Sequence, residues 1–121
     1  LIVYTEDKYG NREEETCDGK HQLDMPLAVL VNENSASASE ILAAALQDNG
    51  FKLVGQNTYG KGVIQSTAEL SDGSAIKLTI MQYFSPDGSK IHKKGVKPDY
   101  EVKNEEDSST DAQLEKALSL F

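Results

Sequence analysis

The chain has 121 residues, of which 38% are hydrophobic and 26% charged, as expected for one modest globular domain. Its formal net charge of −8 disfavours nucleic-acid binding, because phosphate contacts need clustered lysine and arginine. The single cysteine, Cys17, excludes an internal disulfide, and no Cys/His spacing suits zinc, so we expect neither a metal nor a cofactor.

The N-terminal quarter of the chain predicts two strands separated by a polar segment. Residues 1–5 read as a strand, and because the chain begins directly on it, we expect an excised domain. Residues 6–24 are polar and predict an exposed loop or a short hairpin. Residues 27–31, Leu-Ala-Val-Leu-Val, are wholly apolar, which favours a strand buried on both faces of a parallel sheet.

A run of small residues, Asn-Ser-Ala-Ser-Ala-Ser-Glu, then leads into a helix. Ser37 and Glu40 have the Ser-x-x-Glu spacing of a capping box, and strong helix formers follow at residues 41–46. Asp-Asn-Gly at residues 48–50 predicts the end of the helix, and residues 51–55 predict a second strand. Strand, helix and strand together predict a βαβ unit with a parallel pair and a right-handed crossover.

A hairpin is predicted next. Residues 63–70 and 74–84 are strand-like and flank a Ser-Asp-Gly turn. Ile76, Leu78 and Ile80 alternate with polar residues, so we expect one face of this hairpin to be buried.

The C-terminal part is less regular. Residues 90–97 form a basic cluster without aromatic residues, which we interpret as a solvated loop, and residues 101–107 predict an acidic linker. Thr110 and Gln113 offer a second capping box. Apolar residues at positions 114, 117, 118 and 121 then predict a short amphipathic helix.

Two segments could carry chemistry together. A serine at a helix start, such as Ser37, lies where backbone N–H groups are unpaired and the potential is positive, so the Ala38 N–H could stabilise an oxyanion. Lys61 stands between two glycines and could act as base. A free lysine has a pKa of about 10.4, so we expect burial to favour its neutral form, with the neutral Gln65 orienting the amine.

Simpler interpretations exist for each of these residues. The capping box explains Ser37 and Glu40 without chemistry, and Ser35 and Ser39 are rival hydroxyls. A lysine between glycines is commonly a surface turn residue. A histidine-dependent hydrolase would have to use His21 or His92, both of which we expect to be exposed.

Four motifs in order then resemble one family. They are Val-Leu-Val-Asn-x-x-Ser-Ala-Ser-Ala-Ser-Glu-Ile, Thr-Tyr-Gly-Lys-Gly-x-x-Gln, Tyr-Phe-Ser-Pro-Asp-Gly and Gly-Val-Lys-Pro-Asp. Over residues 26–102 the chain resembles the carboxyl-terminal processing (tail-specific) proteases of peptidase family S41. The resemblance implies an α/β, ClpP/crotonase-like core fragment with a βαβ unit, a following β-hairpin and a short C-terminal helix.

The resemblance also implies a function and its residues. It implies a serine endopeptidase that cleaves protein substrates near their C-termini through a serine–lysine dyad. Matched residue by residue, the nucleophile is Ser37, the general base is Lys61 and the residue that orients the lysine is Gln65. Residues 1–103 would be a partial protease core, and residues 104–121 an acidic linker with the amphipathic helix.

Further expectations concern the whole protein. Family members carry a PDZ domain and a glycine-rich turn that supplies the second oxyanion N–H. Neither motif is found in this sequence, so we expect the fragment to be inactive alone. The resemblance implies an extracytoplasmic location in the cell envelope, with membrane anchoring of the full-length protein as one option. Homodimers could form through an exposed strand edge at residues 1–5 or 27–31. The alternative is a non-catalytic module on the same fold that binds lipophilic ligands or peptides.

Overall fold

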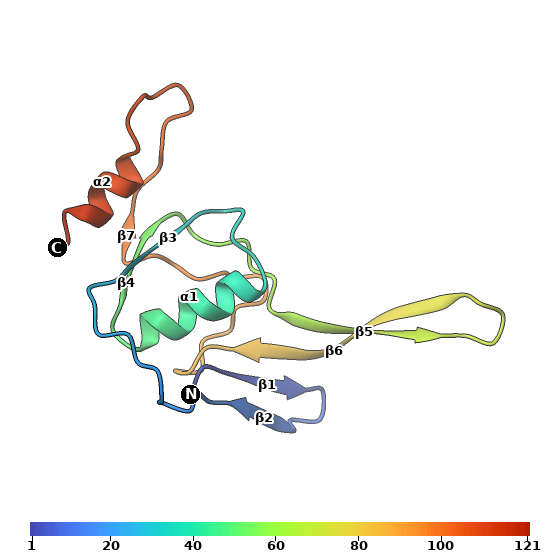
Figure 1. Cartoon of the computed structure of the whole chain (residues 1–121). Helices are drawn as coiled ribbons and strands as arrows, with labels where there is room; N and C mark the ends of the chain where they lie inside the picture. Colours follow the sequence, from blue (N-terminus) through green and yellow to red (C-terminus); the bar gives the residue numbers. More distant parts are fainter.

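Two β-sheets and two helices make up the fold, which a computed structural model describes over residues 1–121 (Figure 1). One sheet has four strands in the order β2-β1-β6-β5, and the other has three in the order β3-β4-β7. The elements are β1 Val3–Asp7, β2 Arg12–Glu15, β3 Ala28–Val31, α1 Ala38–Asp48, β4 Lys52–Gly55, β5 Val63–Glu69, β6 Ala75–Phe84, β7 Tyr100–Glu101 and α2 Ala112–Leu118.

The predicted βαβ unit is present. β3 and β4 are parallel, with Ala28 opposite Lys52 and Val31 opposite Gly55, and α1 forms the connection between them. Figure 1 shows α1 lying between the two sheets. The polar segment after β1 turns back as the short antiparallel strand β2, so the hairpin expected there is confirmed.

One hydrophobic core joins both sheets through α1. Ala43 and Ala44 of α1 are buried, and their small side chains let the helix lie close to the strands on either side. The other buried members of the core come from four strands and from the segment between β6 and β7: Val3, Val31, Leu53, Tyr83, Ile91 and Val96.

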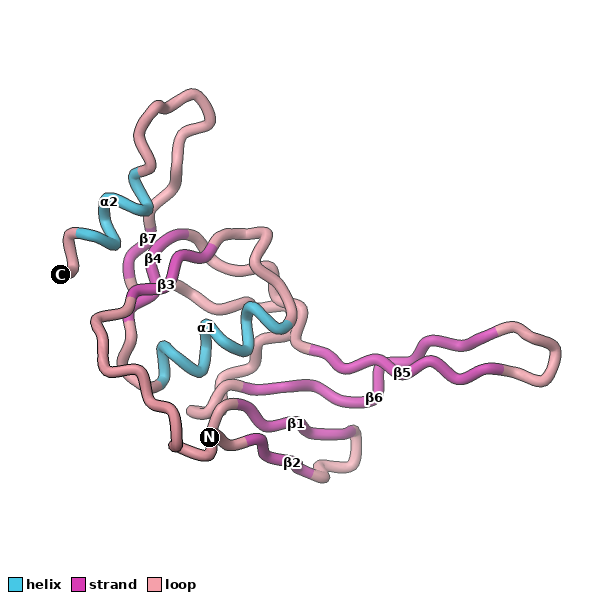
Figure 2. The backbone as a smooth tube through the Cα atoms, viewed as in Figure 1, coloured by secondary structure: helices cyan, strands magenta, loops and turns pink.

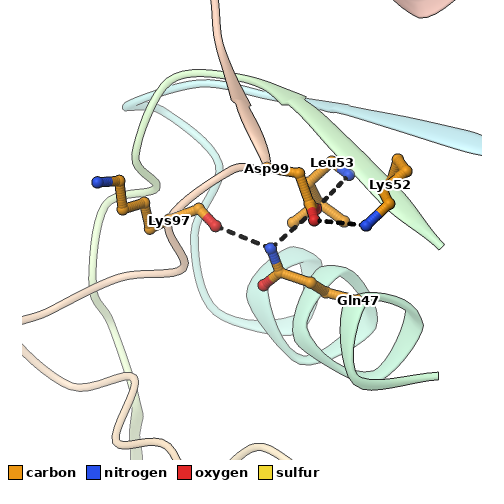
Figure 3. Close-up of polar contacts among 5 residues, drawn as sticks. All are labelled: Gln47, Lys52, Leu53, Lys97 and Asp99. Atoms are coloured by element: carbon orange, nitrogen blue, oxygen red, sulfur yellow. Dashed lines mark hydrogen bonds and ion pairs between the residues drawn. The ribbon is translucent and has the colours of Figure 1, made fainter. Parts of the chain in front are cut away.

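Asp99 fastens the segment before β7 to the far end of α1 and the start of β4 (Figure 3). Its carboxylate accepts hydrogen bonds from the Leu53 N–H and the Gln47 amide, each at 3.0 Å, and pairs with the Lys52 ammonium at 3.0 Å. The Gln47 amide also donates to the Lys97 carbonyl at 2.9 Å. β7 lies parallel to β4. The sequence patterns predicted no strand here, and they assigned its second residue, Glu101, to the acidic linker.

The β5–β6 hairpin extends away from the rest of the chain (Figure 2). Its two strands are antiparallel, but β1 pairs only with the last residues of β6, from Met81 to Phe84. Ile76, Leu78 and Ile80 are therefore 43%, 55% and 44% exposed, and the expected buried face is wrong. The alternation marks a face suited to burial, but no element of this chain lies over it.

Two strand expectations also need correction. β3 is an edge strand, so only Val31 is buried while Leu27 and Leu30 are 38% and 43% exposed. β1 was expected as a free edge but lies between β2 and β6. Of the two candidate edges for dimerisation, only β3 is unpaired on one side.

The predicted C-terminal helix exists as α2, which packs beside β3 and β4. Its N-cap is Asp111, whose carboxylate accepts from the Leu114 N–H at 3.0 Å, and not Thr110. Of its expected apolar face only Ala117 is buried, whereas Leu114, Leu118 and Phe121 are 44%, 62% and 65% exposed. Neither helix is long and apolar enough to cross a membrane.

Candidate active site

Ser37 occupies a strained position at the start of α1. Its φ and ψ are 58° and −119°, and only one other non-glycine residue, Lys93, has a positive φ. Such conformations cost about 1–3 kcal/mol and are found mainly where the surrounding structure enforces them, often at active sites. The side chain is half-buried, and its hydroxyl accepts no helix N–H with normal hydrogen-bond geometry, although Ser37 and Glu40 form a capping-box pair.

Glu40 is the polar centre of this region. It is fully buried, and its carboxylate accepts four hydrogen bonds. Oε1 accepts from the Thr58 hydroxyl at 2.5 Å and from the Gly60 N–H at 2.6 Å. Oε2 accepts from the N–H groups of Ser37 and Lys61, both at 2.9 Å. A buried carboxylate is tolerated when its oxygens are satisfied in this way. Here it joins the residues around Ser37 (the serine segment) to the residues around Lys61 (the lysine segment).

The sequence indicated only part of this role. The Ser-x-x-Glu spacing predicted that Glu40 would accept from the Ser37 N–H, which is confirmed. Nothing in a local pattern indicates partners 18 to 21 residues further along the chain. The Thr58–Lys61 segment becomes a partner only because β4 returns the chain to the start of α1.

The glycines on either side of Lys61 allow close packing of the backbone against a neighbouring segment. A Cβ at Gly62 would lie 2.4 Å from the His92 nitrogen, and one at Gly60 would lie 3.1 Å from the Gly95 nitrogen. The loop therefore packs closely against residues 91–95. The Lys61 side chain itself is exposed and makes no ion pair, so the expectation that the glycines bury it is wrong in this structure.

The remaining predicted residues lie at different distances from this centre. Ala38 is the first residue of α1, and its N–H donates no hydrogen bond within the chain. This N–H is therefore free to donate to an external acceptor. The exposed Gln65 amide donates to the Thr79 hydroxyl at 3.4 Å and not to Lys61. Gln65 thus lies on the hairpin, immediately after a bulge at Ile64, without contact to the lysine amine.

The histidines do not form an alternative site. His21 is exposed, as expected. His92 was expected to be exposed but is half-buried, and its Nδ1 is buried without a partner. Its backbone lies close to Gly62. Within the chain no group of histidine, cysteine or carboxylate side chains has the arrangement of a metal site.

Tyr83 was not identified from the sequence as a site residue. It comes from β6, is 3% exposed and donates a hydrogen bond from its hydroxyl to the Lys61 carbonyl. Burial raises the pKa of Tyr83, a hydrogen bond with the Ser37 side chain lowers it, and the charge of Glu40 raises it, with a net increase. The phenol therefore keeps its proton at neutral pH and can donate it to the Lys61 carbonyl.

Comparison with known proteins gives a consistent assignment. The sequence matches peptidase family S41 over residues 1–102. It is 48% identical to a carboxyl-terminal-processing protease of Synechocystis sp., covering 99% of this chain and 30% of that protein. The solved structure of a photosystem II D1 C-terminal processing protease superposes with a TM-score of 0.80 at 42% identity, covering 84% of this chain and 27% of that one.

A more distant structure has the same fold. A lipoprotein from Streptococcus agalactiae superposes with a TM-score of 0.71 at 25% identity, over 98% of this chain and 43% of that one. The chain spans about a third of the length of the curated relatives it matches, at 30% and 31%. With a family match over residues 1–102 and near-complete coverage by a relative of 48% identity, this chain belongs to peptidase family S41.

Proposed function

We propose that this chain forms the catalytic core of a serine endopeptidase in which Ser37 is the nucleophile and Lys61 the general base. The observation that carries this proposal is the Glu40 carboxylate, whose Oε2 accepts from the N–H groups of both residues at 2.9 Å. A buried carboxylate fully used in joining two loops fixes their backbones relative to each other. This is the positioning that an attack by one side chain, assisted by the other, requires.

The reaction would proceed in two halves. The Ser37 hydroxyl attacks the scissile carbonyl while the neutral Lys61 amine takes its proton, and the Ala38 N–H donates to the oxyanion. Collapse of the tetrahedral intermediate breaks the C–N bond, and the Lys61 ammonium returns the proton to the leaving amine. In the second half Lys61 takes a proton from a water molecule, which attacks the acyl carbonyl. The C–O bond to Ser37 then breaks, and the Lys61 ammonium returns the proton to the Ser37 oxygen, which releases the new carboxyl terminus and regenerates both residues.

The side chains of Lys61 and Gln65 must move for this reaction. Lys61 is exposed, and Gln65 donates to Thr79. The proposal requires Lys61 to swing toward Ser37 about its fixed backbone and Gln65 to leave Thr79 to orient the amine. An extended, flexible lysine side chain makes such a movement inexpensive.

The substrates and setting of the whole protein are part of the proposal. The relatives are named for processing carboxyl termini, so we propose cleavage of protein substrates near their C-termini. The unpaired edge of β3 would serve for homodimerisation. A location outside the cytoplasm, in the cell envelope, is consistent with the streptococcal relative being a lipoprotein. Residues 1–103 would form the protease core and residues 104–121 a linker and helix, and the core alone would be inactive.

The test is proteolysis of a disordered protein by the full-length protein that carries this chain. Ser37→Ala and Lys61→Ala should each reduce kcat by about 10³-fold or more. Ser39→Ala and Lys77→Ala are matched controls, because both residues are exposed and Ser39 is a rival hydroxyl on the same turn. Wild-type rates for both Ser37→Ala and Lys61→Ala would reject the dyad and leave the non-catalytic binding module as the interpretation.

A further inference from the structure

Tyr83 holds the lysine segment from a side that Glu40 does not reach. Its hydroxyl donates to the Lys61 carbonyl, and its backbone N–H donates to the Gly62 carbonyl at 3.1 Å. Glu40 meanwhile accepts from the Lys61 N–H at 2.9 Å. The peptide groups on both sides of the Lys61 Cα are therefore fixed, one by a carboxylate from α1 and the other by a phenol from β6.

Only the side chain of Lys61 is left free. It is exposed and unpaired, whereas the backbone that carries it is held at its N–H and its carbonyl. This arrangement makes the Lys61 Cα a fixed pivot. Rotation about the side-chain torsions can then bring the amine to one defined place, rather than to a range of places set by a mobile loop.

The segment that Tyr83 holds is already joined to the nucleophile. Glu40 Oε2 accepts from the N–H groups of both Ser37 and Lys61, each at 2.9 Å. Tyr83 is 3% exposed, and the one proton of its hydroxyl goes to the Lys61 carbonyl. A shift of the Lys61 backbone would therefore change the position from which the lysine side chain can reach Ser37.

Tyr4 provides a matched tyrosine for comparison. It lies in β1, is 9% exposed, is paired with Phe84 across the strands and stacks on the Phe84 ring at 5.0 Å between centroids. Its hydroxyl makes no hydrogen bond within the chain and is not a fully enclosed polar atom. Tyr4→Phe therefore removes a hydroxyl from a ring in the same sheet without breaking a hydrogen bond.

We propose that Tyr83 is a positioning residue for the serine–lysine pair, with its hydroxyl holding the Lys61 carbonyl and so fixing the backbone from which the lysine side chain reaches Ser37. The proposal rests on the proposed function, because it gives Tyr83 a role only if Ser37 and Lys61 react together. Tyr83 itself contacts neither a reacting substrate atom nor a cofactor. Its loss should therefore change how often the pair is aligned and leave the binding of substrate unaffected.

The experiment compares Tyr83→Phe with Tyr4→Phe in the full-length protein that carries this chain, using a disordered protein substrate. Both changes remove one hydroxyl from a buried ring in the same sheet. Tyr83→Phe should lower kcat by about 10- to 100-fold with KM within about twofold of wild type, because misalignment reduces the reactive fraction. Tyr4→Phe should leave both parameters near wild type. Thermal unfolding midpoints of the two variants are measured in parallel.

Each other outcome overturns the proposal. Tyr83→Phe with wild-type kcat would show that the hydroxyl positions nothing that matters. A fall in kcat shared equally by Tyr4→Phe, with matching losses in unfolding midpoint, would assign the effect to stability. Ser37→Ala is included to separate the two hypotheses. If it retains wild-type activity, the proposed function fails, whereas a normal Tyr83→Phe beside an inactive Ser37→Ala rejects only the role of Tyr83.

Discussion

The backbone N–H groups of Ser37 and Lys61 donate to one oxygen atom, Oε2 of Glu40, each at 2.9 Å. The two residues are far apart in sequence, and a single buried carboxylate brings their backbones together. Because Oε1 is also occupied by Thr58 and Gly60, no part of the carboxylate remains for water. The site therefore depends on a buried carboxyl side chain that joins its two segments.

Glu40→Gln should destabilise the protein strongly although it barely changes the side-chain volume. An amide has one oxygen to accept, and its NH₂ group would face two N–H or O–H donors. Leaving two buried donors unsatisfied costs about 2–5 kcal/mol in the free energy of unfolding. Chemical denaturation of the 121-residue chain would measure this loss.

The control for that change is Glu33→Gln, because Glu33 is exposed and makes no hydrogen bond or ion pair. It should stay within about 0.5 kcal/mol of wild type. Equal stability of Glu40→Gln and Glu33→Gln would contradict the central role given to Glu40. In the full-length protein, Glu40→Gln should also reduce proteolysis at temperatures where the fold persists, because the serine and lysine segments are no longer joined.

Gly62→Ala should be costly for steric reasons alone. Gly62 does not have a positive φ, so alanine meets no backbone strain there, but its Cβ would lie 2.4 Å from the His92 nitrogen and 2.9 Å from the His92 Cα. Backbone atoms cannot swing away, so the loop must shift, at a cost of about 1–3 kcal/mol or more. The comparison is Gly10→Ala, where φ is 83° and no atom lies within 4 Å, so strain is the only cost. A thermal midpoint for Gly62→Ala above that of Gly10→Ala would show that the loop is loosely packed.

The parts of the fold that could be predicted from the sequence are those set by neighbours along the chain. The apolar run, the capping box at Ser37 and the Asp-Asn-Gly end of α1 each report local chemistry, and the βαβ unit follows from their order. The link from Glu40 to Thr58 and the bond from Tyr83 to Lys61 depend on where separate elements meet. No residue spacing in the sequence indicates these long-range contacts. The pairing of β7 with β4 is another such contact, because it accompanies the hydrogen bond from the Leu53 N–H to Asp99, just before β7.

Burial was harder to predict than secondary structure. The alternation over β6 correctly indicated a strand, yet the apolar face lies open because nothing in the chain covers it. Changing Ile76, Leu78 and Ile80 to threonine should therefore cost the 121-residue chain less than about 1 kcal/mol in total. Ile91→Ala, at a residue 1% exposed in the core, should cost about 2–5 kcal/mol. A large loss from the hairpin changes would mean that this face is covered in solution.

Asp99 should make the stability of the chain depend on pH in the acid range. Burial raises the pKa of Asp99, but hydrogen bonds from Leu53, Gln47 and Lys52, with the charge of Lys52, lower it more. A folded pKa below the unfolded value of about 3.9 adds stability that is complete above that value and is lost as pH falls through the folded pKa. Asp99→Asn should thus cost about 1–2 kcal/mol at neutral pH and progressively less as the pH falls below the unfolded value.

The matched change is Asp24→Asn, because Asp24 is exposed and makes no hydrogen bond. Thermal midpoints of both variants and of wild type are compared at neutral pH and over a series of acidic pH values. A gap between wild type and Asp99→Asn that stays constant as the pH is lowered would mean that the carboxylate charge contributes nothing, and that only the shape of the side chain matters.

The last prediction concerns the charge state of Lys61 and separates a base from a simple cation. A lysine base must lose its proton, so the activity of the full-length protein should rise with pH until the amine is neutral. Arginine remains protonated throughout that range, and Lys61→Arg keeps the backbone contacts to Glu40 and Tyr83 because these use only the N–H and the carbonyl. Lys61→Arg should therefore be folded, with a thermal midpoint near wild type, and as inactive as Lys61→Ala. Substantial activity in the arginine variant would show that position 61 supplies positive charge and that another group takes the proton from Ser37.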